Sequence, residues 1–382
     1  MLLVIAHEWG HFIMARKNGV KVNEFGIGFP PRAAAWVKKS GKWHKLPKSE
    51  WNQPQDSLIL SVNYLPIGGF CAMDGESDAD TCQGTFGAAS FWSKTKILFG
   101  GVLMNWLVAI VIFTVLAFTG MPQFIDHQFY LGQDATVIGD GVTVVEVMPD
   151  SPAAKAGFQT NDKFLTVAGQ EVHTANEITT YGQNHANEIV EYKVERNGEE
   201  VILKPQLNPA GSEYSLGVSM NSGQALIRST WSAPLVGVGT TLQLTGETFR
   251  SLGVLVWDLV SGVVRQFSPN SSVRDAGQAA IQAAGDSVSG PVGIIGIIFP
   301  AFTSAGPTNL AFLAALISVS LACMNVLPIP ALDGGRWLLI AIYRLRRKKL
   351  TKETEEKLVS RAMLALLALI VIITILDITR FF

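Results

Sequence analysis

The stretch MLLVIAHEWGHFIMARKNGV (residues 1–20) opens with six apolar residues and then carries two imidazoles and a carboxylate. On a helix, His7 and His11 share one face, so their ring nitrogens can converge on a metal ion with Glu8 beside its open position. Ionisable groups at bilayer depth cost roughly 2.5 to 3.5 kcal/mol each on insertion scales, which favours a functional role. The alternative is a pair of interfacial histidines with satisfied hydrogen bonds.

Hydrophobicity is concentrated in a few segments of this 382-residue chain, which is 48% hydrophobic and only 16% charged. Residues 97–119 form an apolar run without a charge, residues 308–332 form a second, and residues 362–376 form a third. Each is close to the ~20 residues needed to cross a hydrocarbon core, given some tilt or flanking apolar residues for the shortest. The composition predicts a multi-pass membrane protein.

Basic residues are distributed unevenly, although the formal net charge is only −1. Residues 12–96 hold eleven Lys or Arg and residues 344–352 hold six, whereas the 186 residues from 121 to 306 hold nine. The positive-inside rule therefore places 12–96 and 344–361 in the cytoplasm and 121–306 outside. The three cysteines fall in cytoplasmic or membrane parts, so no disulfide framework is expected.

The exported region contains two kinds of pattern. Alternating residues predict strands at 142–147, 163–169 and 189–204, the last a hairpin turning at Asn197-Gly198, and a short helix begins at Ser151. Residues 231–267 predict an amphipathic helix, either packed on this domain or lying at the membrane surface. The stretch 268–290, rich in Ser, Asn, Gly and Ala, is expected to be a linker or loop.

A catalytic zinc ion needs a third protein ligand, and the remaining four histidines lie in predicted soluble segments. The apolar run at 308–332 ends in NVLPIPALDGGRW, where Asp333 is the only acidic residue between Asp286 and Glu353. The prolines break a helix and the glycines permit close backbone approach, as expected where irregular backbone lines a cavity at membrane depth. Asp333 is thus the candidate third ligand, and an ordinary helix-end charge is the alternative.

Several motifs together resemble the site-2 protease family of intramembrane zinc metalloproteases, in its bacterial regulator-of-sigma-E protease branch, which cleaves anti-sigma factors. They are HEWGH (7–11), FGIGFPP (25–31), LPIGGFCAMDGE (65–76), the pair Gly101 and Asn105, SGPVGI (289–294) and NVLPIPALDGG (325–335). The sequence DSPAAKAGF (150–158) is similar to a turn common in PDZ domains, here in a single copy. Two departures are a Lys- and Trp-rich insert at about 36–56 and Val102 where relatives often have Pro.

The resemblance implies specific roles for residues of this chain. His7, His11 and Asp333 are implied to bind Zn²⁺, with Glu8 as the catalytic carboxylate. Asn325 is implied to lie near the site and help hold substrate, and Pro328 and Pro330 are expected to contact substrate with it.

The expected fold is a multi-pass α-helical membrane protein with about four transmembrane segments, the first truncated. It carries an inserted extracytoplasmic β-rich PDZ-like domain and a cytoplasmic, membrane-associated β-hairpin region. The expected divisions are an N-terminal membrane core (1–120), the PDZ-like domain (121–220), an amphipathic helix and linker (221–306) and a C-terminal membrane core (307–382). The expected location is a bacterial inner membrane, with the active site toward the cytoplasm.

The expected reaction is hydrolysis of a peptide bond within or near the transmembrane segment of a membrane protein, such as an anti-sigma factor after a first cleavage or a remnant signal peptide. The expected partners are single-pass membrane proteins, a peptide or C-terminus in the PDZ groove and membrane lipid, with no nucleic acid. SLILSVNY (57–64) is expected to offer a strand edge to an unwound substrate, with a buried hairpin as the alternative. The outer domain is expected to act as a size filter.

Two other classes of function remain open at this point. A catalytically silent scaffold could recruit partners through the PDZ-like domain, but it would have no reason to keep Glu8 together with His7, His11 and Asp333. A zinc-dependent transporter usually needs more spans and an internal repeat, and no repeat is visible in the sequence.

The first helix is expected to be incomplete in this sequence. Only fifteen residues separate Met1 from the end of the apolar segment at Ala15, against the ~20 that a span requires. We therefore expect an N-terminal truncation or a start at an internal methionine, with a genuine half-span helix as the alternative.

Overall fold

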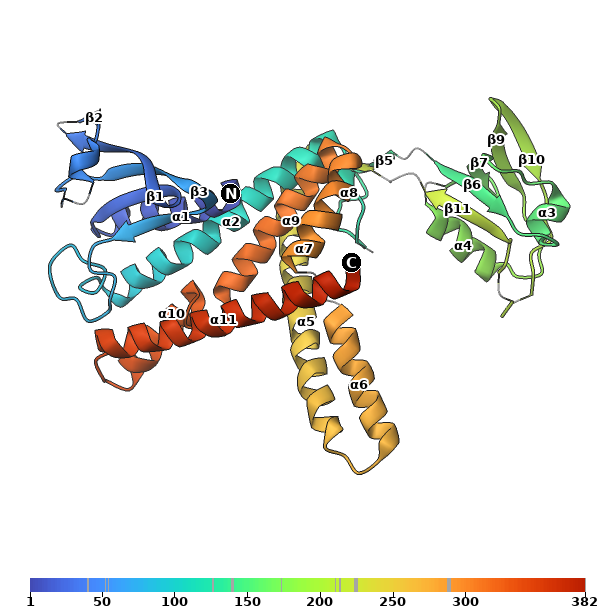
Figure 1. Cartoon of the computed structure of the whole chain (residues 1–382). Coiled ribbons are helices and arrows are strands. Elements are labelled where there is room, and N and C mark those ends of the chain that lie inside the picture. The colour runs from blue at the N-terminus through green and yellow to red at the C-terminus, as the bar shows by residue number, and fades with distance from the viewer. Residues whose placement is uncertain are drawn as a thin grey trace. The chain divides into compact units, whose positions relative to one another are not determined.

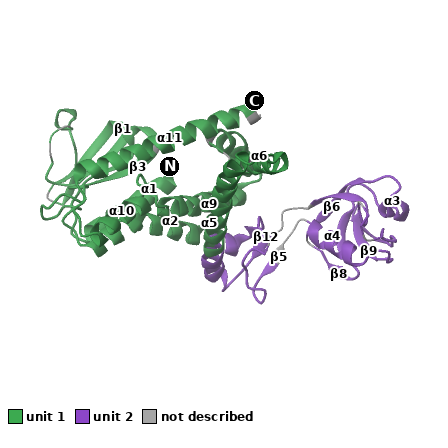
Figure 2. Ribbon diagram, turned by 90° about the horizontal axis from the view of Figure 1, so that it is seen from below, with its two compact units in different colours: residues 1–112, 241–382 green, residues 113–240 purple. Residues whose placement is uncertain are grey.

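The computed structural model describes the chain except residues 40, 52, 54, 126, 139, 140, 173, 210, 213, 223–225, 287–289 and 382. It divides into two compact units, coloured separately in Figure 2. The helical unit comprises residues 1–112 and 241–382, and the strand-rich unit comprises residues 113–240. Each unit is described by itself.

Three helices are long and apolar enough to cross a membrane: α2 (Phe91–Thr119), α9 (Pro307–Val326) and α11 (Lys352–Phe381). They cover the predicted apolar runs at 97–119 and 362–376, and the run at 308–332 as far as Val326, where α9 ends. Helix α1 (Leu2–Lys17) has 16 residues, which corresponds to a length of about 24 Å. Helix α10 (Asp333–Leu345) follows α9 after a short turn that contains Pro328 and Pro330.

A three-stranded sheet lies beside α1 (Figure 1) and is formed by β1 (Val22–Lys39), β2 (Lys42–Lys45) and β3 (Ile59–Met73) in the order β2-β1-β3. A single turn, η1 (Lys48–Glu50), separates β2 from β3. Residues 59–62 of β3 face residues 24–27 of β1 on one side and residues 34–37 on the other. The expectation of a free strand edge at 57–64 is therefore wrong, because the 18-residue β1 is long enough to flank this segment twice.

Helices α5 (Ala233–Gln266) and α6 (Ser271–Asp286) form a hairpin (Figure 1). The predicted helix at 231–267 is confirmed, but the predicted loop at 268–290 is wrong over the 16 residues of α6. Five alanines give this segment a high helix propensity, which outweighs its serines and glycine. Gly262 and Gly277 allow the close approach, since a Cβ on Gly262 would lie 2.9 Å from the carbonyl oxygen of Gly277.

Helix α11 fastens the chain that leads into α9. The buried carboxylate of Asp377 accepts backbone N–H groups from Gly290 (3.1 Å) and Gly293 (2.9 Å). Gly290 precedes α7 (Pro291–Gly293) and Gly293 is its last residue, and α7 continues through a π-helical turn (Ile294–Ile298) into α8 (Phe299–Ser304). The carboxylate thus satisfies orphan donors at a helix start that water cannot reach inside an apolar environment.

The strand-rich unit contains a sheet with the order β10-β9-β7-β6-β11, in which β8 also pairs with β7. Its strands are β6 (Val142–Val147), β7 (Lys163–Val167), β8 (Gln170–Glu171), β9 (Tyr192–Arg196), β10 (Glu199–Leu203) and β11 (Val218–Ser222). The predicted strands and hairpin are confirmed, and Asn197 and Gly198 both have the positive φ that a tight hairpin turn requires. Helix α3 (Pro152–Ala156) starts at Ser151, whose hydroxyl accepts from the N–H of Ala154, and α4 (Ala175–Asn184) has a capping box.

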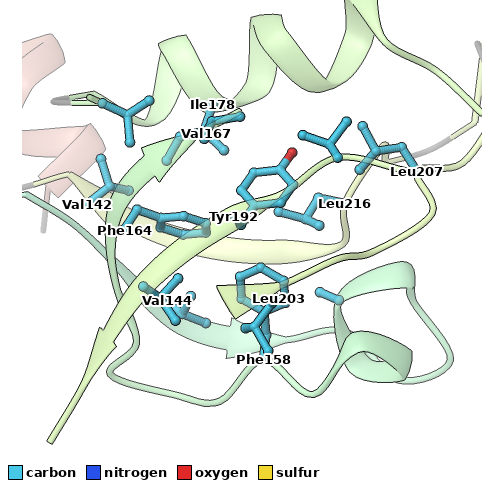
Figure 3. Packing of buried hydrophobic residues seen from close by; sticks show 14 residues of the cluster. Val142, Val144, Phe158, Phe164, Val167, Ile178, Tyr192, Leu203, Leu207 and Leu216 are labelled. Carbon is cyan, nitrogen blue, oxygen red and sulfur yellow. The ribbon is translucent and has the colours of Figure 1, made fainter. Parts of the chain in front are cut away.

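Fourteen buried residues form the core of this unit, around Phe164 and Tyr192 (Figure 3). Alternate residues of β6 and β9, such as Val142 and Val144, point into it, as the period of two in their sequence requires. A second small sheet in the order β4-β12-β5 joins β4 (Met121–Pro122), β12 (Leu226–Arg228) and β5 (Thr136–Ile138).

Candidate metal centre

The two histidines of the HEWGH segment lie side by side on α1 and are both buried. Their rings meet edge to face, with centroids 4.7 Å apart, and their Nε2 atoms lie 3.1 Å from each other. The other ring nitrogen of His11, Nδ1, lies 2.8 Å from the backbone oxygen of Ile97 in α2. Each ring thus directs the same nitrogen to a common point.

Helix α2 makes room for these rings with a glycine. A Cβ on Gly101 would lie 2.6 Å from His11 Nε2 and 2.6 Å from His7 Cε1. On α1, Gly10 follows His7 by about one turn and packs against the backbone of Gly100, which leaves similarly little space for a Cβ. The Gly101 position of the sequence motif is therefore part of the wall of the site.

Asp333 comes from a part of the chain more than 300 residues away and completes the cluster. Its Oδ2 atom lies 3.1 Å from Nε2 of His7 and 3.3 Å from Nε2 of His11. Asp333 begins α10, and the next two residues must be glycine, since a Cβ on Gly334 would meet the Val326 backbone at 2.1 Å and one on Gly335 the Ile329 backbone at 2.0 Å. The close packing of α10 on this turn places the carboxylate.

These three side chains fit a zinc ion. Their ligand atoms all lie within 4.8 Å of one another. Oδ2 of Asp333 is buried and makes no hydrogen bond with suitable geometry in the described part of the chain, which leaves a lone pair for a cation. Two imidazole nitrogens and one carboxylate oxygen form a donor set that zinc accepts in catalytic sites, with the fourth position left for water or substrate.

Glu8 lies beside this cluster and is partly buried between α1 and β3. A Cβ on Gly69 of β3 would lie 3.7 Å from Cγ of Glu8. The glycine pair 68–69 lets the strand come this close to α1. The sheet therefore orients the carboxylate that the sequence assigned to catalysis.

A polar network outside the cluster holds α10 in place. The guanidinium of Arg336, one turn after Asp333, contacts Glu355 of α11 with Nε 3.2 Å from Oε1. Glu355 is buried and also accepts the Ser77 hydroxyl and the Asp78 N–H, both at 3.0 Å. No sequence motif pointed to Glu355, because its partners lie far from it along the chain.

The three residues predicted to contact substrate lie between the end of α9 and Asp333. Asn325 is in the last turn of α9 and is partly buried. Pro328 is exposed and Pro330 is partly buried in the turn that follows. They neighbour Asp333 in sequence, and their contact with substrate stays a prediction.

Comparison with known proteins identifies the family. Residues 1–370 match peptidase family M50. The chain belongs to this family, the site-2 proteases. A putative zinc metalloprotease of Clostridium perfringens is 29% identical over 91% of this chain and 87% of that protein. The zinc metalloprotease RasP of Oceanobacillus iheyensis is 24% identical over 93% of this chain and 91% of that protein. This M50 protein is accordingly a zinc metalloendopeptidase.

Among solved structures, part of this M50 chain is similar to the PDZ domain of an SdrC-like protein from Listeria monocytogenes. The match covers 22% of this chain and 92% of that domain's chain, at 19% identity and a TM-score of 0.20.

Proposed function

We propose that this M50 protein cleaves a peptide bond within or near the transmembrane segment of a membrane protein. The observation that carries the proposal is the level along α2 at which this helix contacts the metal cluster. The contacts of the two histidines fall at Ile97, Gly101 and Asn105, inside the apolar part of a helix long enough to cross a membrane. A peptide bond must therefore reach this level of the bilayer to be cut.

In this proposal His7, His11 and Asp333 hold zinc, and Glu8 handles the proton. When bound, the ion would supply a Lewis acid for the scissile carbonyl and would lower the pKa of a water molecule there. Glu8 accepts the proton of that water as general base and returns it to the leaving amine.

Substrate is proposed to lie along the turn between α9 and α10. Asn325 offers an amide that can pair with an unwound substrate backbone, whose carbonyls are otherwise engaged in helical hydrogen bonds. Pro328 and Pro330 lack N–H donors and keep this segment from continuing α9, so its backbone stays irregular. Single-pass membrane proteins are the proposed substrates, including anti-sigma factors after a first cut and remnant signal peptides.

The strand-rich unit is proposed to be a PDZ-like peptide-binding domain outside the membrane. A pocket of about 430 Å³ lies between α4 and β11 and is lined by Ile178, Leu216, Gly217, Val218 and Met220. An extended peptide or a C-terminus could add there as a strand. As a folded domain outside the membrane, the unit would also hinder substrates with bulky outer domains and so act as a size filter.

The proposed setting is a bacterial inner membrane with the metal cluster toward the cytoplasm. The basic residues at 12–96 and 344–352 support this orientation. They also support contacts with membrane lipid. The scaffold alternative is not favoured, because a scaffold has no use for three converging ligand atoms and an adjacent carboxylate.

The test is cleavage of a single-pass model substrate by the purified, lipid-reconstituted protein and by Glu8→Gln. We expect the wild type to cut inside the apolar segment, with the site mapped by mass spectrometry, and Glu8→Gln to be slower by about 10² to 10⁴. Glu199→Gln, an exposed glutamate of β10, is the matched control and should cut like the wild type. Equal cleavage by Glu8→Gln and wild type, or cuts confined to soluble segments, would contradict the proposal.

A further inference from the structure

We propose that Asn105 is a positioning residue that selects the ring tautomer of His7, and so presents the correct nitrogen of His7 to the metal. This inference rests on the proposed metal site and assigns a role to a residue of α2 that is itself no ligand. Asn105 is completely buried, and its Nδ2 lies 3.4 Å from Nδ1 of His7. Asn105 therefore contacts the edge of the His7 imidazole that faces away from the cluster.

The two histidines show why such a contact is needed. A neutral imidazole carries one proton, and the hydrogen bond made by one nitrogen decides which nitrogen keeps a lone pair. Nδ1 of His11 faces the carbonyl oxygen of Ile97 at 2.8 Å, which can only accept, so Nδ1 must carry the proton and Nε2 is free. Nδ1 of His7 faces a side-chain amide instead, which can donate or accept.

The side-chain amide of Asn105 can favour the metal-binding tautomer of His7 by turning. When Nδ2 of Asn105 faces the ring, Nδ1 of His7 accepts its N–H. The ring proton is then on Nε2, which lies 3.1 Å from Oδ2 of Asp333. A half turn of the amide presents Oδ1, which accepts a hydrogen bond from Nδ1–H and leaves the lone pair of Nε2 for a metal. Oδ1 is buried and has no hydrogen-bond partner among the described residues in the first arrangement, so it is available for the second.

The surroundings of Asn105 fix its position. The hydroxyl of Ser318 in α9 donates to the backbone oxygen of Asn105 at 2.8 Å, which ties this turn of α2 to α9. Gly101, one turn earlier on α2, brings the helix against both rings. The amide can therefore turn about its own bond while its backbone stays in place.

The experiment measures zinc affinity by competition with a chelator, in the full-length protein in detergent, for Asn105→Leu and Asn105→Asp. Leucine keeps nearly the same volume but cannot accept a hydrogen bond, and we expect zinc affinity to fall by about 10- to 100-fold. Aspartate only accepts, so Asn105→Asp should bind zinc at least as tightly as the wild type. Asn309→Leu removes another buried amide, in α9, and should leave zinc affinity unchanged.

The outcomes separate this inference from the proposed function. If Asn105→Leu binds zinc like the wild type, or if Asn105→Leu and Asn105→Asp are weakened equally, tautomer selection is refuted while the metal site stands. If His7→Ala leaves zinc affinity unchanged, the metal site of the proposed function is itself wrong.

Discussion

The core of the strand-rich unit and the metal cluster of the helical unit show two ways of filling an interior. The first gathers fourteen buried residues, Phe164 and Tyr192 among them, from a segment of about 80 consecutive positions. The second gathers imidazoles, a carboxylate and an amide from α1, α2 and α10, in which Asn105 and Asp333 lie 98 and 326 positions after His7. Apolar packing defines the first through volume alone, whereas the second depends on the direction of individual atoms.

The largest effect is expected from a substitution in the apolar core of the strand-rich unit. Phe164 is 1% exposed and touches the rings of Phe158 and Tyr192, so Phe164→Ala should destabilise the strand-rich unit by about 3 to 5 kcal/mol. Hydrogen exchange of residues 142–221 in the full chain should show this loss, while zinc affinity stays at the wild-type value. A parallel fall in zinc affinity would mean that the two interiors are coupled.

A smaller effect is expected from one methyl group at the metal cluster. The Cβ of Gly101→Ala would lie 2.6 Å from both imidazoles, and overpacking of this kind costs about 1 to 3 kcal/mol. We expect weaker zinc binding with little change in the strand-rich unit.

Gly253→Ala is the matched control for that change. Gly253 lies inside α5, and a Cβ there meets nothing within 4 Å, so alanine should raise helix stability slightly and leave zinc binding unaltered. Tight zinc binding by Gly101→Ala would contradict the close packing of α2 on the rings.

The smallest effect concerns acid stability of the strand-rich unit. Desolvation raises the pKa of Asp134, but hydrogen bonds from Ser232 and Thr230 outweigh it and hold the pKa at about 2. Because this value lies below the ordinary one of ~3.9, the bonds stabilise the folded state above about pH 4, and this stability is lost as the pH falls toward 2. The unfolding temperatures of wild type and Asp134→Asn should therefore differ at neutral pH and converge near pH 2. A constant difference would show that the carboxylate charge is irrelevant.

Local patterns predicted much of the fold. Strands at 142–147 and 163–167, the Asn197-Gly198 turn and the three long apolar helices follow from the alternation and length of apolar runs. Helix α6 was not predicted, because its serines and glycines are typical of a loop, whereas its five alanines and its packing against α5 favour a helix. The pairing of residues 59–62 on both sides also depends on how β1 bends, which no local pattern records.

For the site, the sequence could name side chains but not their supports. The spacing of His7 and His11 and the isolation of Asp333 marked three groups that the structure brings together. The carbonyl of Ile97 has no side-chain signature, and the role of Glu355 depends on its contacts with Arg336 and Ser77. Such contacts between distant residues are set by packing, so they required the structure.

The roles of Asp333 as a zinc ligand and Glu8 as the general base are tested together by one comparison. It measures the zinc content of the purified wild type, Asp333→Ala and Glu8→Gln, and their cleavage of the single-pass substrate. We predict that Asp333→Ala loses both zinc and cleavage, whereas Glu8→Gln keeps its zinc and loses cleavage. An Asp333→Ala protein that retains zinc as tightly as the wild type and still cleaves the substrate would contradict the account.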